Sequence, residues 1–216
     1  MKLKIWFNLW LEKYVKYSVK LHTFIIYQKI IENHLIPILG EYELDKIKYE
    51  TLQNFIIEKI EYGNLKTNGK LSSNTIFLIS SILKQSFKQA LLLKLITDNP
   101  TLYLKYPSLT EKEVNAFSRK EQQIIENYCL NSTKNNYLGI IICLYTGIRI
   151  GELLALTWDD IDFSNQFMRI NKTTYFMNGK TYVDSPKTKS SNRMIPLSKR
   201  MIAILKRMKK YAIQGI

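Results

Sequence analysis

Apolar residues in the first hundred positions recur with the three- and four-residue spacing of amphipathic helices. This spacing predicts helices over residues 4–17, 23–35, 50–61 and 72–97. Thr23 is a suitable N-cap for the second, and Ser72 or Ser73 for the fourth. The Ile36-Pro-Ile-Leu-Gly40 segment should end the second helix, and Asp98-Asn-Pro100 the fourth. The pattern predicts a four-helix bundle of about a hundred residues.

The second half begins with helical spacing and then changes to alternation. Ser118 and Glu121 have the spacing of a capping box, and they introduce predicted helices over residues 119–130, 135–145 and from 149 onward. After Asp162 the alternating pattern predicts strands at 166–174, 180–184 and 193–197, with a hairpin turn at Asn178-Gly179. Ser198 should cap a last helix over residues 199–211. We therefore expect a mainly α fold with a small antiparallel β-sheet, divided into domains 1–105 and 118–216 by a linker at 106–117.

The charge of the chain indicates what kind of partner it binds. The chain carries 32 Lys and Arg against 18 Asp and Glu, a formal net charge of +14, and such an excess favours an anionic polymer, most often nucleic acid. Both halves are basic, at +6 for residues 1–105 and +8 for residues 106–216. All six arginines follow Ser118, so only the second half has the forked side chain that suits two phosphate oxygens.

Other residue types argue against several functional classes. Cys129 and Cys143 lack metal-ligand spacing and are expected to be buried free thiols, while His22 and His34 are expected on partly exposed helix positions. The N-terminus has no signal-peptide pattern, and no apolar run is long enough to span a bilayer. We expect a cytoplasmic protein with no metal, no cofactor and no membrane partner.

The stretch from Leu144 to Asp162 contains the most distinctive candidate for chemistry. Gly147 breaks the helical period between two apolar helices, which places Arg149 at a tight corner with core residues on both sides. A guanidinium in such a place is costly to bury, so it should need an anionic partner such as a phosphate. Glu152, one helical turn later, could hold it in position. The alternative is an interhelical Arg–Glu ion pair with no chemistry.

A second motif follows the predicted hairpin. The sequence Pro186-Lys-Thr-x-x-Ser-x-Arg-x-Ile-Pro-Leu197 puts two lysines, Lys187 and Lys189, on a turn before the last strand. Taken with Thr146-Gly-x-Arg-x-Gly-Glu-Leu153, it resembles the tyrosine recombinases, also called phage integrases. The Phe117-Ser-x-x-Glu121 opening is similar to the start of their catalytic domains.

The resemblance implies roles for individual residues. Residues 1–105 would be the helical, SAM-like core-binding domain, and residues 118–216 the first part of the catalytic domain. Arg149 would stabilise the scissile phosphate, and Lys187 would protonate the leaving 5′ oxygen, with Lys189 as its competitor or a DNA contact. Glu152 and Arg193 would be supporting residues. The first domain offers reasonable phosphate contacts at Lys66, Lys70, Lys84 and Lys88. The partners would be double-stranded DNA at recombination sites and other recombinase protomers.

Two parts of the family's active site are missing from this sequence. There is no His after residue 34, so the family's His-x-x-Arg box is absent. Tyr175, Tyr182 and Tyr211 are better interpreted as packing or surface residues than as the nucleophile that forms a 3′-phosphotyrosyl link. We therefore expect a chain truncated before this box and the nucleophile, and not competent for strand transfer alone. The alternative is a non-catalytic DNA-binding remnant or regulator acting at mobile-element ends.

Overall fold

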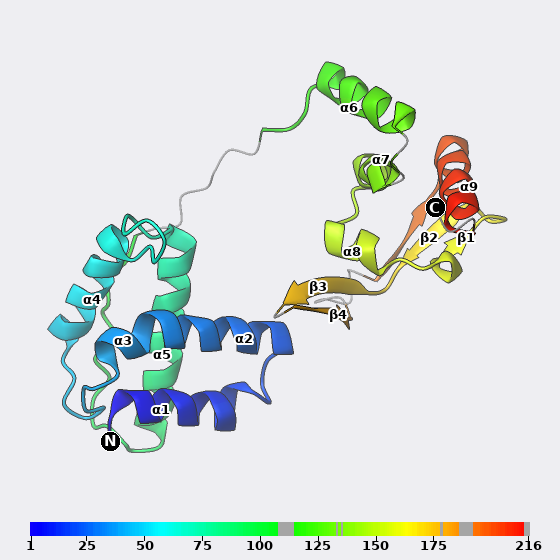
Figure 1. The fold of residues 1–216 in the computed structure, drawn as a ribbon. Coiled ribbons are helices and arrows are strands. Elements are labelled where there is room, and N and C mark those ends of the chain that lie inside the picture. The colour runs from blue at the N-terminus through cyan, green and yellow to red at the C-terminus, as the bar shows by residue number, and fades with distance from the viewer. Residues whose placement is uncertain (108–114, 133, 135, 178, 186–191, 214–216) are drawn as a thin grey trace. The chain divides into compact units, whose positions relative to one another are not determined.

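The computed structural model of the 216-residue chain describes residues 1–107, 115–132, 134, 136–177, 179–185 and 192–213. The chain forms two compact units, Met1–Glu113 and Val114–Ile216 (Figure 1). The division between them falls within the segment predicted as a linker.

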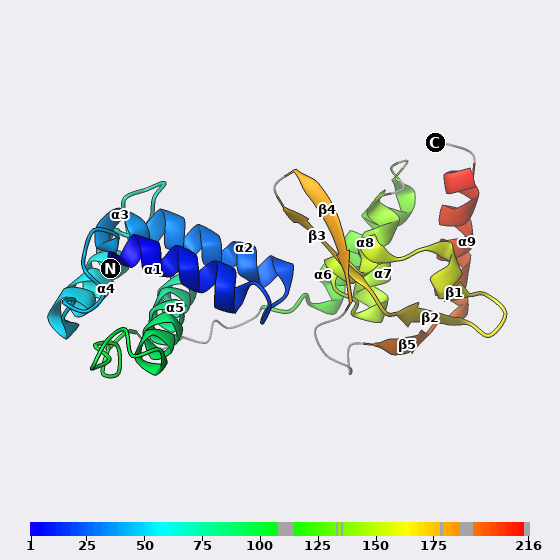
Figure 2. The same cartoon turned by 90° about the horizontal axis from the view of Figure 1, so that it is seen from below.

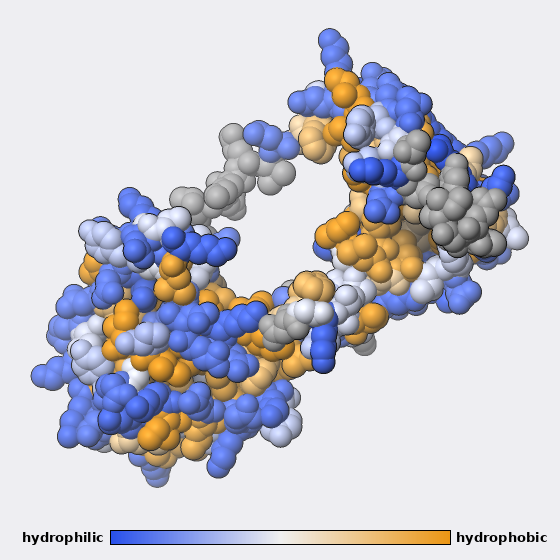
Figure 3. Space-filling model, in the orientation of Figure 1, coloured by the Kyte–Doolittle hydropathy of each residue, from blue (hydrophilic) through white to orange (hydrophobic). Residues whose placement is uncertain are grey.

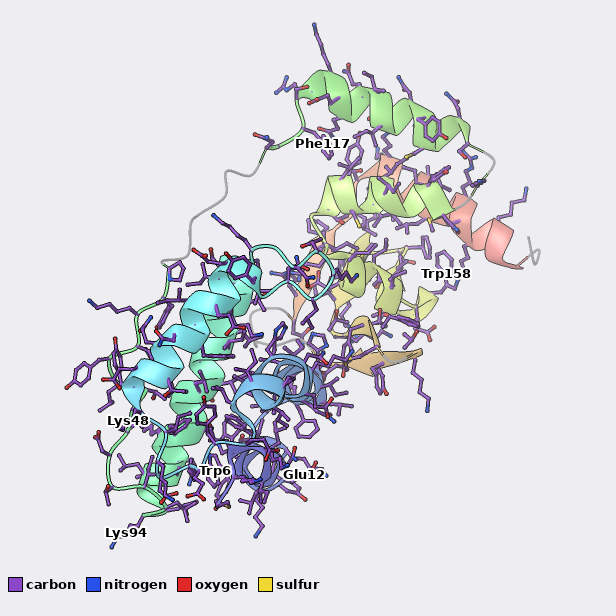
Figure 4. The ribbon with its side chains drawn as sticks, turned by 60° about the vertical axis from the view of Figure 1, so that its left-hand side comes forward. Trp6, Glu12, Lys48, Lys94, Phe117 and Trp158 are labelled. Atoms are coloured by element: carbon purple, nitrogen blue, oxygen red, sulfur yellow. The ribbon has the colours of Figure 1, made fainter. Side chains whose placement is uncertain are left out.

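Among its described residues, the regular elements of the first unit are helices, with a β-bridge between Lys2 and Glu43. Its elements are α1 (Leu3–Trp10), the π-helical turn η1 (Leu11–Val15), α2 (Leu21–Ile30), the π-helical turn η2 (Ile31–Leu35), α3 (Ile36–Leu39), α4 (Tyr49–Tyr62) and α5 (Ser73–Leu92). The apolar faces of these helices meet in one core around Trp6 (Figure 4). Trp6, Leu35, Leu83 and Phe87 are fully buried there. Removal of this apolar surface from water is the main stabilising contribution to the unit.

Three predicted details of the first unit are wrong. The second helix begins at Leu21, so Thr23 lies inside it, and it continues through Pro37 to Leu39. Directly before Pro37, the N–H of Ile36 bonds to the carbonyl of Ile31, which is the wider π spacing. The widened turn lets a helix continue past a residue that has no N–H to donate. The fourth helix ends at Leu92 rather than Thr97, at a turn where Lys94 has φ of +56°.

The second unit combines helices with two small sheets. Its elements are α6 (Arg119–Asn131), α7 (Asn136–Thr146), α8 (Ile150–Ala155), the 3-10 turn η3 (Trp158–Asp160), β1 (Ile161–Asp162), β2 (Phe167–Ile170), β3 (Thr173–Met177), β4 (Lys180–Asp184), β5 (Arg193–Pro196) and α9 (Lys199–Ile213). Antiparallel strands in the order β1-β2-β5 form one sheet, and β3 and β4 form a separate hairpin (Figure 2). The core lies between the helices and the three-stranded sheet, around Ile141, Met168, Ile170 and Leu205.

The expected mainly α fold with a small antiparallel sheet is confirmed, with one change in the strands. The single strand predicted over residues 166–174 is two strands, separated at Asn171 and Lys172, so that β3 leaves the sheet and pairs with β4. The capping box at Ser118 is present, with Glu121 accepting the Ser118 N–H at 2.8 Å. Ser198 caps α9 by accepting the N–H of Met201 at 3.2 Å.

Candidate nucleic-acid interface

The corner between α7 and α8 places the candidate residue Arg149. Gly147 ends α7 with φ of +66°, a conformation that side chains with a Cβ rarely adopt, and its N–H bonds to the Cys143 carbonyl at 2.9 Å. Ile148 then inserts into the core with only 5% exposure. Arg149 follows in an extended conformation as the N-cap residue of α8. The buried Ile148 therefore fixes the backbone from which the Arg149 side chain projects.

Glu152 holds both the backbone and the side chain of Arg149. Its Oε2 accepts the Arg149 N–H at 2.9 Å, and its Oε1 accepts the Arg149 guanidinium at 3.1 Å. The Arg149 side chain is 75% exposed, while that of Glu152 is 5% exposed. The charge that needs compensation in the interior is the carboxylate. The exposed guanidinium keeps N–H groups directed to solvent.

Arg193 supplies the compensating charge. It begins β5, 41 residues after Glu152, and its guanidinium donates to Oε1 at 3.1 Å and to Oε2 at 2.9 Å. This paired geometry is the strong form of an arginine–carboxylate interaction. The hydrogen bonds from Arg193 lower the pKa of Glu152 to about 2, with a smaller lowering effect from Arg149, and they raise the pKa of Arg193. Glu152 is therefore ionised at neutral pH.

The shared carboxylate leaves the site with one net positive charge. Two guanidinium groups meet one buried anion, and the more exposed of the two, Arg149, is anchored at its backbone. A fixed guanidinium with unused N–H groups can bind two oxygens of a phosphate. No group of three or more His, Cys, Asp or Glu residues that could hold a metal ion occurs among the described residues.

The base of the β3–β4 hairpin packs directly on α8. The Thr174 hydroxyl donates to the Gly151 carbonyl at 3.3 Å. A Cβ at Gly151 would lie 2.6 Å from both the Thr173 Oγ1 and the Thr174 carbonyl oxygen, so only glycine allows this approach. The hairpin therefore restricts how α8, and with it Arg149, can move.

A network around the buried carboxylate of Glu126, which the sequence did not reveal, lies at the C-terminal end of α7. Glu126 of α6 is 7% exposed, accepts the Tyr145 hydroxyl at 2.8 Å and forms an ion pair with Arg200 of α9. The hydrogen bond to Glu126 is the main cause of the raised pKa of Tyr145. These residues join the end of α7 to α6 and α9. Their separations of 19 residues or more leave no local spacing signal from which the network could be found.

The remaining predicted site residues are dispersed. Lys187 and Lys189 lie outside the described residues. Lys66, Lys70 and Lys88 are exposed, whereas the Lys84 ammonium donates to the Tyr106 hydroxyl at 3.1 Å and lies over its ring. Figure 3 shows hydrophilic side chains over much of the surface of both units, with hydrophobic residues between them.

Expectations for the histidines and cysteines hold only in part. His22 is half-buried, but His34 is buried, contrary to prediction, and burial lowers its pKa. Cys129 is a buried free thiol, and Cys143 is a free thiol that is only half-buried. Within the described part of the chain, every helix is too short or too polar to cross a bilayer.

Comparisons with known proteins agree with this architecture. Residues 108–215 match the model of the phage integrase family, and residues 2–60 match that of the phage integrase N-terminal SAM-like domain. A tyrosine recombinase XerC-like protein of Caldanaerobacter subterraneus subsp. tengcongensis is 31% identical over 171 residues, which cover 76% of this chain and 41% of the relative. The chain spans about two fifths of the length of the curated relatives that it matches.

Two solved structures share the fold. The Tn1549 transposon integrase in complex with a circular intermediate DNA has a TM-score of 0.80 at 22% identity, covering 97% of this chain and 65% of that one. A lambda integrase dimer bound to a COC′ core site has a TM-score of 0.66 at 16% identity, covering 97% and 63%. With one family model matching each unit, the chain belongs to the phage integrase, or tyrosine recombinase, family.

Proposed function

We propose that this chain is the DNA-binding portion of a site-specific tyrosine recombinase, and that Arg149 contacts a backbone phosphate at the recombination site. One observation carries the proposal: a 75% exposed guanidinium is fixed at its base by a carboxylate that is itself 5% exposed. A side chain anchored in this way loses little further conformational entropy when it binds a phosphate.

Glu152 and Arg193 support Arg149 in this proposal. Arg193 keeps Glu152 ionised and oriented, and Glu152 in turn sets the direction of Arg149. Arg193 itself is 30% exposed and already donates to both carboxylate oxygens. We therefore propose that it positions Glu152 and does not contact the phosphate. On the basis of the family motif, Lys187 remains our candidate for the proton donor to the leaving oxygen. Lys189 remains our candidate for a neighbouring DNA contact.

Partners follow from the family and from the solved relatives. The Tn1549 integrase structure contains DNA, and the lambda integrase structure is a dimer on its core site. By analogy, we infer that this chain binds double-stranded DNA together with other recombinase protomers, in the cytoplasm. The first unit would add backbone contacts through exposed lysines, of which Lys66, Lys70 and Lys88 are better placed than the Tyr106-bound Lys84.

Strand transfer needs groups that this sequence does not supply. In the family, a tyrosine attacks the phosphate and a second arginine from a His-x-x-Arg box helps to stabilise the transition state. With no His after residue 34, the box cannot be formed, and we propose that these residues alone make no phosphotyrosyl link. The same observation supports a second candidate function, a non-catalytic DNA-binding protein or regulator at mobile-element ends.

The experiment measures binding to a duplex that carries the element's end, with single phosphates replaced in turn by uncharged methylphosphonates. Arg149→Ala should weaken binding to the native duplex by roughly 10- to 100-fold, the range for one charge-assisted contact. At one position the methylphosphonate should abolish the difference between Arg149→Ala and wild type. Arg169, exposed on β2, supplies the matched control Arg169→Ala. Equal binding of Arg149→Ala and wild type to every duplex would refute the phosphate contact.

A nicked suicide duplex tests the catalytic part separately. It traps a covalent protein–DNA adduct if any tyrosine acts as a nucleophile. We expect binding without an adduct, and a robust adduct formed by these 216 residues would contradict our proposal that they are not competent.

A further inference from the structure

Helix α9 carries an unusual concentration of positive charge. Between Lys199 and Ile213 the sequence contains six Lys and Arg residues and no Asp or Glu. Three of these cations have internal partners. Arg200 pairs with Glu126, Arg207 donates to the Leu130 carbonyl at 3.1 Å, and Lys209 lies over the rings of Trp158 and Phe163. The packing of α9 within the second unit explains these three cations.

The other three cations, Lys199, Lys206 and Lys210, differ in both exposure and partners. All three are exposed, and the structure gives none of them a hydrogen bond or ion pair with any residue it describes. Separations of seven and four residues place them on one face of the helix. The exposed Ala203 lies on the same face between them. We call these three residues the lysine row.

The lysine row lies opposite the face of α9 that packs into the core. Met201, Ile204 and Leu205 are buried, and at 100° per residue they project from the side of the helix away from the row. The row is therefore presented to solvent along about 16 Å of helix, from a rise of about 1.5 Å per residue. Like charges at this spacing repel one another, so the row costs stability in the free protein. A polyanion would remove that cost.

We propose that the lysine row binds the phosphate backbone of duplex DNA, as a contact additional to that of Arg149. A row of exposed ammonium groups along one helix face suits a repeated anion such as the phosphate backbone, to which most Lys and Arg contacts with DNA are made. A membrane surface is disfavoured, because the apolar face of α9 is buried in the core and unavailable to lipid. The inference rests on the proposed function in taking DNA as the partner.

The experiment compares salt dependence of binding. The full chain with Lys199→Gln, Lys206→Gln and Lys210→Gln is titrated with a long mixed-sequence duplex over a range of salt concentrations. The control removes the same charge from three scattered exposed positions, through Lys13→Gln, Lys120→Gln and Lys134→Gln. Gln and Lys have similar helix propensity, so α9 should remain folded, which circular dichroism checks. A version with three Lys→Arg changes keeps the charge and should bind as wild type does.

Each phosphate contact contributes about 0.9 to the slope of log K against log salt, so loss of the row should reduce the slope by about 2 to 3. The control should reduce it by less than about 1. Equal reductions in the two variants, or no reduction in either, would overturn the proposal that the lysine row binds DNA. Loss of polyglutamate binding by the row variant, with its DNA binding unchanged, would also overturn it. Failure of wild type to bind any duplex would instead refute the proposed function.

Discussion

Glu152 of α8 and Arg193 of β5 form a paired interaction in which two guanidinium nitrogens each donate to a different carboxylate oxygen, at 3.1 and 2.9 Å. The pair joins a helix to a strand 41 residues later in the chain. The same carboxylate also accepts the N–H and the guanidinium of Arg149. One buried carboxylate therefore binds two arginines. Arg193 compensates its charge, and Arg149 remains exposed.

The two arginines should differ sharply in their effect on stability. Arg193→Gln leaves a buried carboxylate with its main partner removed, which typically costs about 3–5 kcal/mol. Arg149→Ala removes a mostly exposed ion pair and should change the free energy of unfolding by less than about 1 kcal/mol. Urea unfolding measured by NMR of fluorine-labelled tryptophan checks this, because Trp158 reports the second unit and Trp6 the first. A larger loss from Arg149→Ala than from Arg193→Gln would contradict the assignment of roles.

The pH dependence of unfolding should reveal the ionised Glu152. Its pKa is about 2 in the folded protein and near the ordinary value of about 4.3 when unfolded, so the unfolded state binds the proton more readily. Its stabilising contribution is complete above about pH 5 and is lost as the pH falls from there towards 2, amounting to roughly 2–3 kcal/mol. The measurement is the difference in unfolding free energy between wild type and Glu152→Gln across that range.

A constant difference between these proteins from pH 5 down to about 2.5 would show that the pKa of Glu152 is not lowered. Asp159→Asn, which changes an exposed carboxylate in the same unit as Glu152, is the control, and its difference from wild type should stay small. Partial acid unfolding of the first unit is recognised from the Trp6 signal, so only the Trp158 transition is used.

Local relationships were predictable from the sequence, and the most important distant one was not. The capping box at Ser118 and the Arg149–Glu152 pair each span three residues, and helical geometry alone brings such residues together. The link from Glu152 to Arg193 depends on where β5 pairs with β2, which no spacing encodes. Sequence motifs named both residues, but only the fold showed that they are partners.

The errors have physical causes as well. Apolar residues flank Arg149, and the positive φ of Gly147 turns the chain so that Ile148 takes the buried position and Arg149 stays exposed. The break between β2 and β3 falls at the adjacent polar residues Asn171 and Lys172, inside the segment predicted as one strand, and β3 then packs on α8. His34 is buried because α2 continues through a π-helical turn, which periodicity does not predict.

Gly151 should tolerate no side chain. In Gly151→Ala the new Cβ would lie 2.6 Å from the Thr174 carbonyl oxygen, which is backbone and cannot rotate away, so the hairpin must move from α8. We expect a loss of about 1–3 kcal/mol, typical of overpacking, and a changed Trp158 signal. Gly69→Ala is the control, because its Cβ would meet only the Thr67 hydroxyl at 3.4 Å. Equal stability of the two variants would mean that the hairpin does not depend on close contact with α8.

Replacing Lys94 with glycine should stabilise the first unit. It follows the end of α5 with φ of +56°, and the N–H of Leu95 bonds back to the Ala90 carbonyl in the arrangement that usually has glycine at this position. A left-handed conformation costs a residue with a Cβ about 1–2 kcal/mol, and glycine avoids this while losing more entropy on folding. We expect Lys94→Gly to stabilise the first unit by about 0.5–1 kcal/mol, measured from the Trp6 transition. Leu92→Gly, two residues earlier in the helix and 67% exposed, should destabilise it by about 1 kcal/mol. Destabilisation by both changes would show that α5 does not end in a left-handed turn at Lys94.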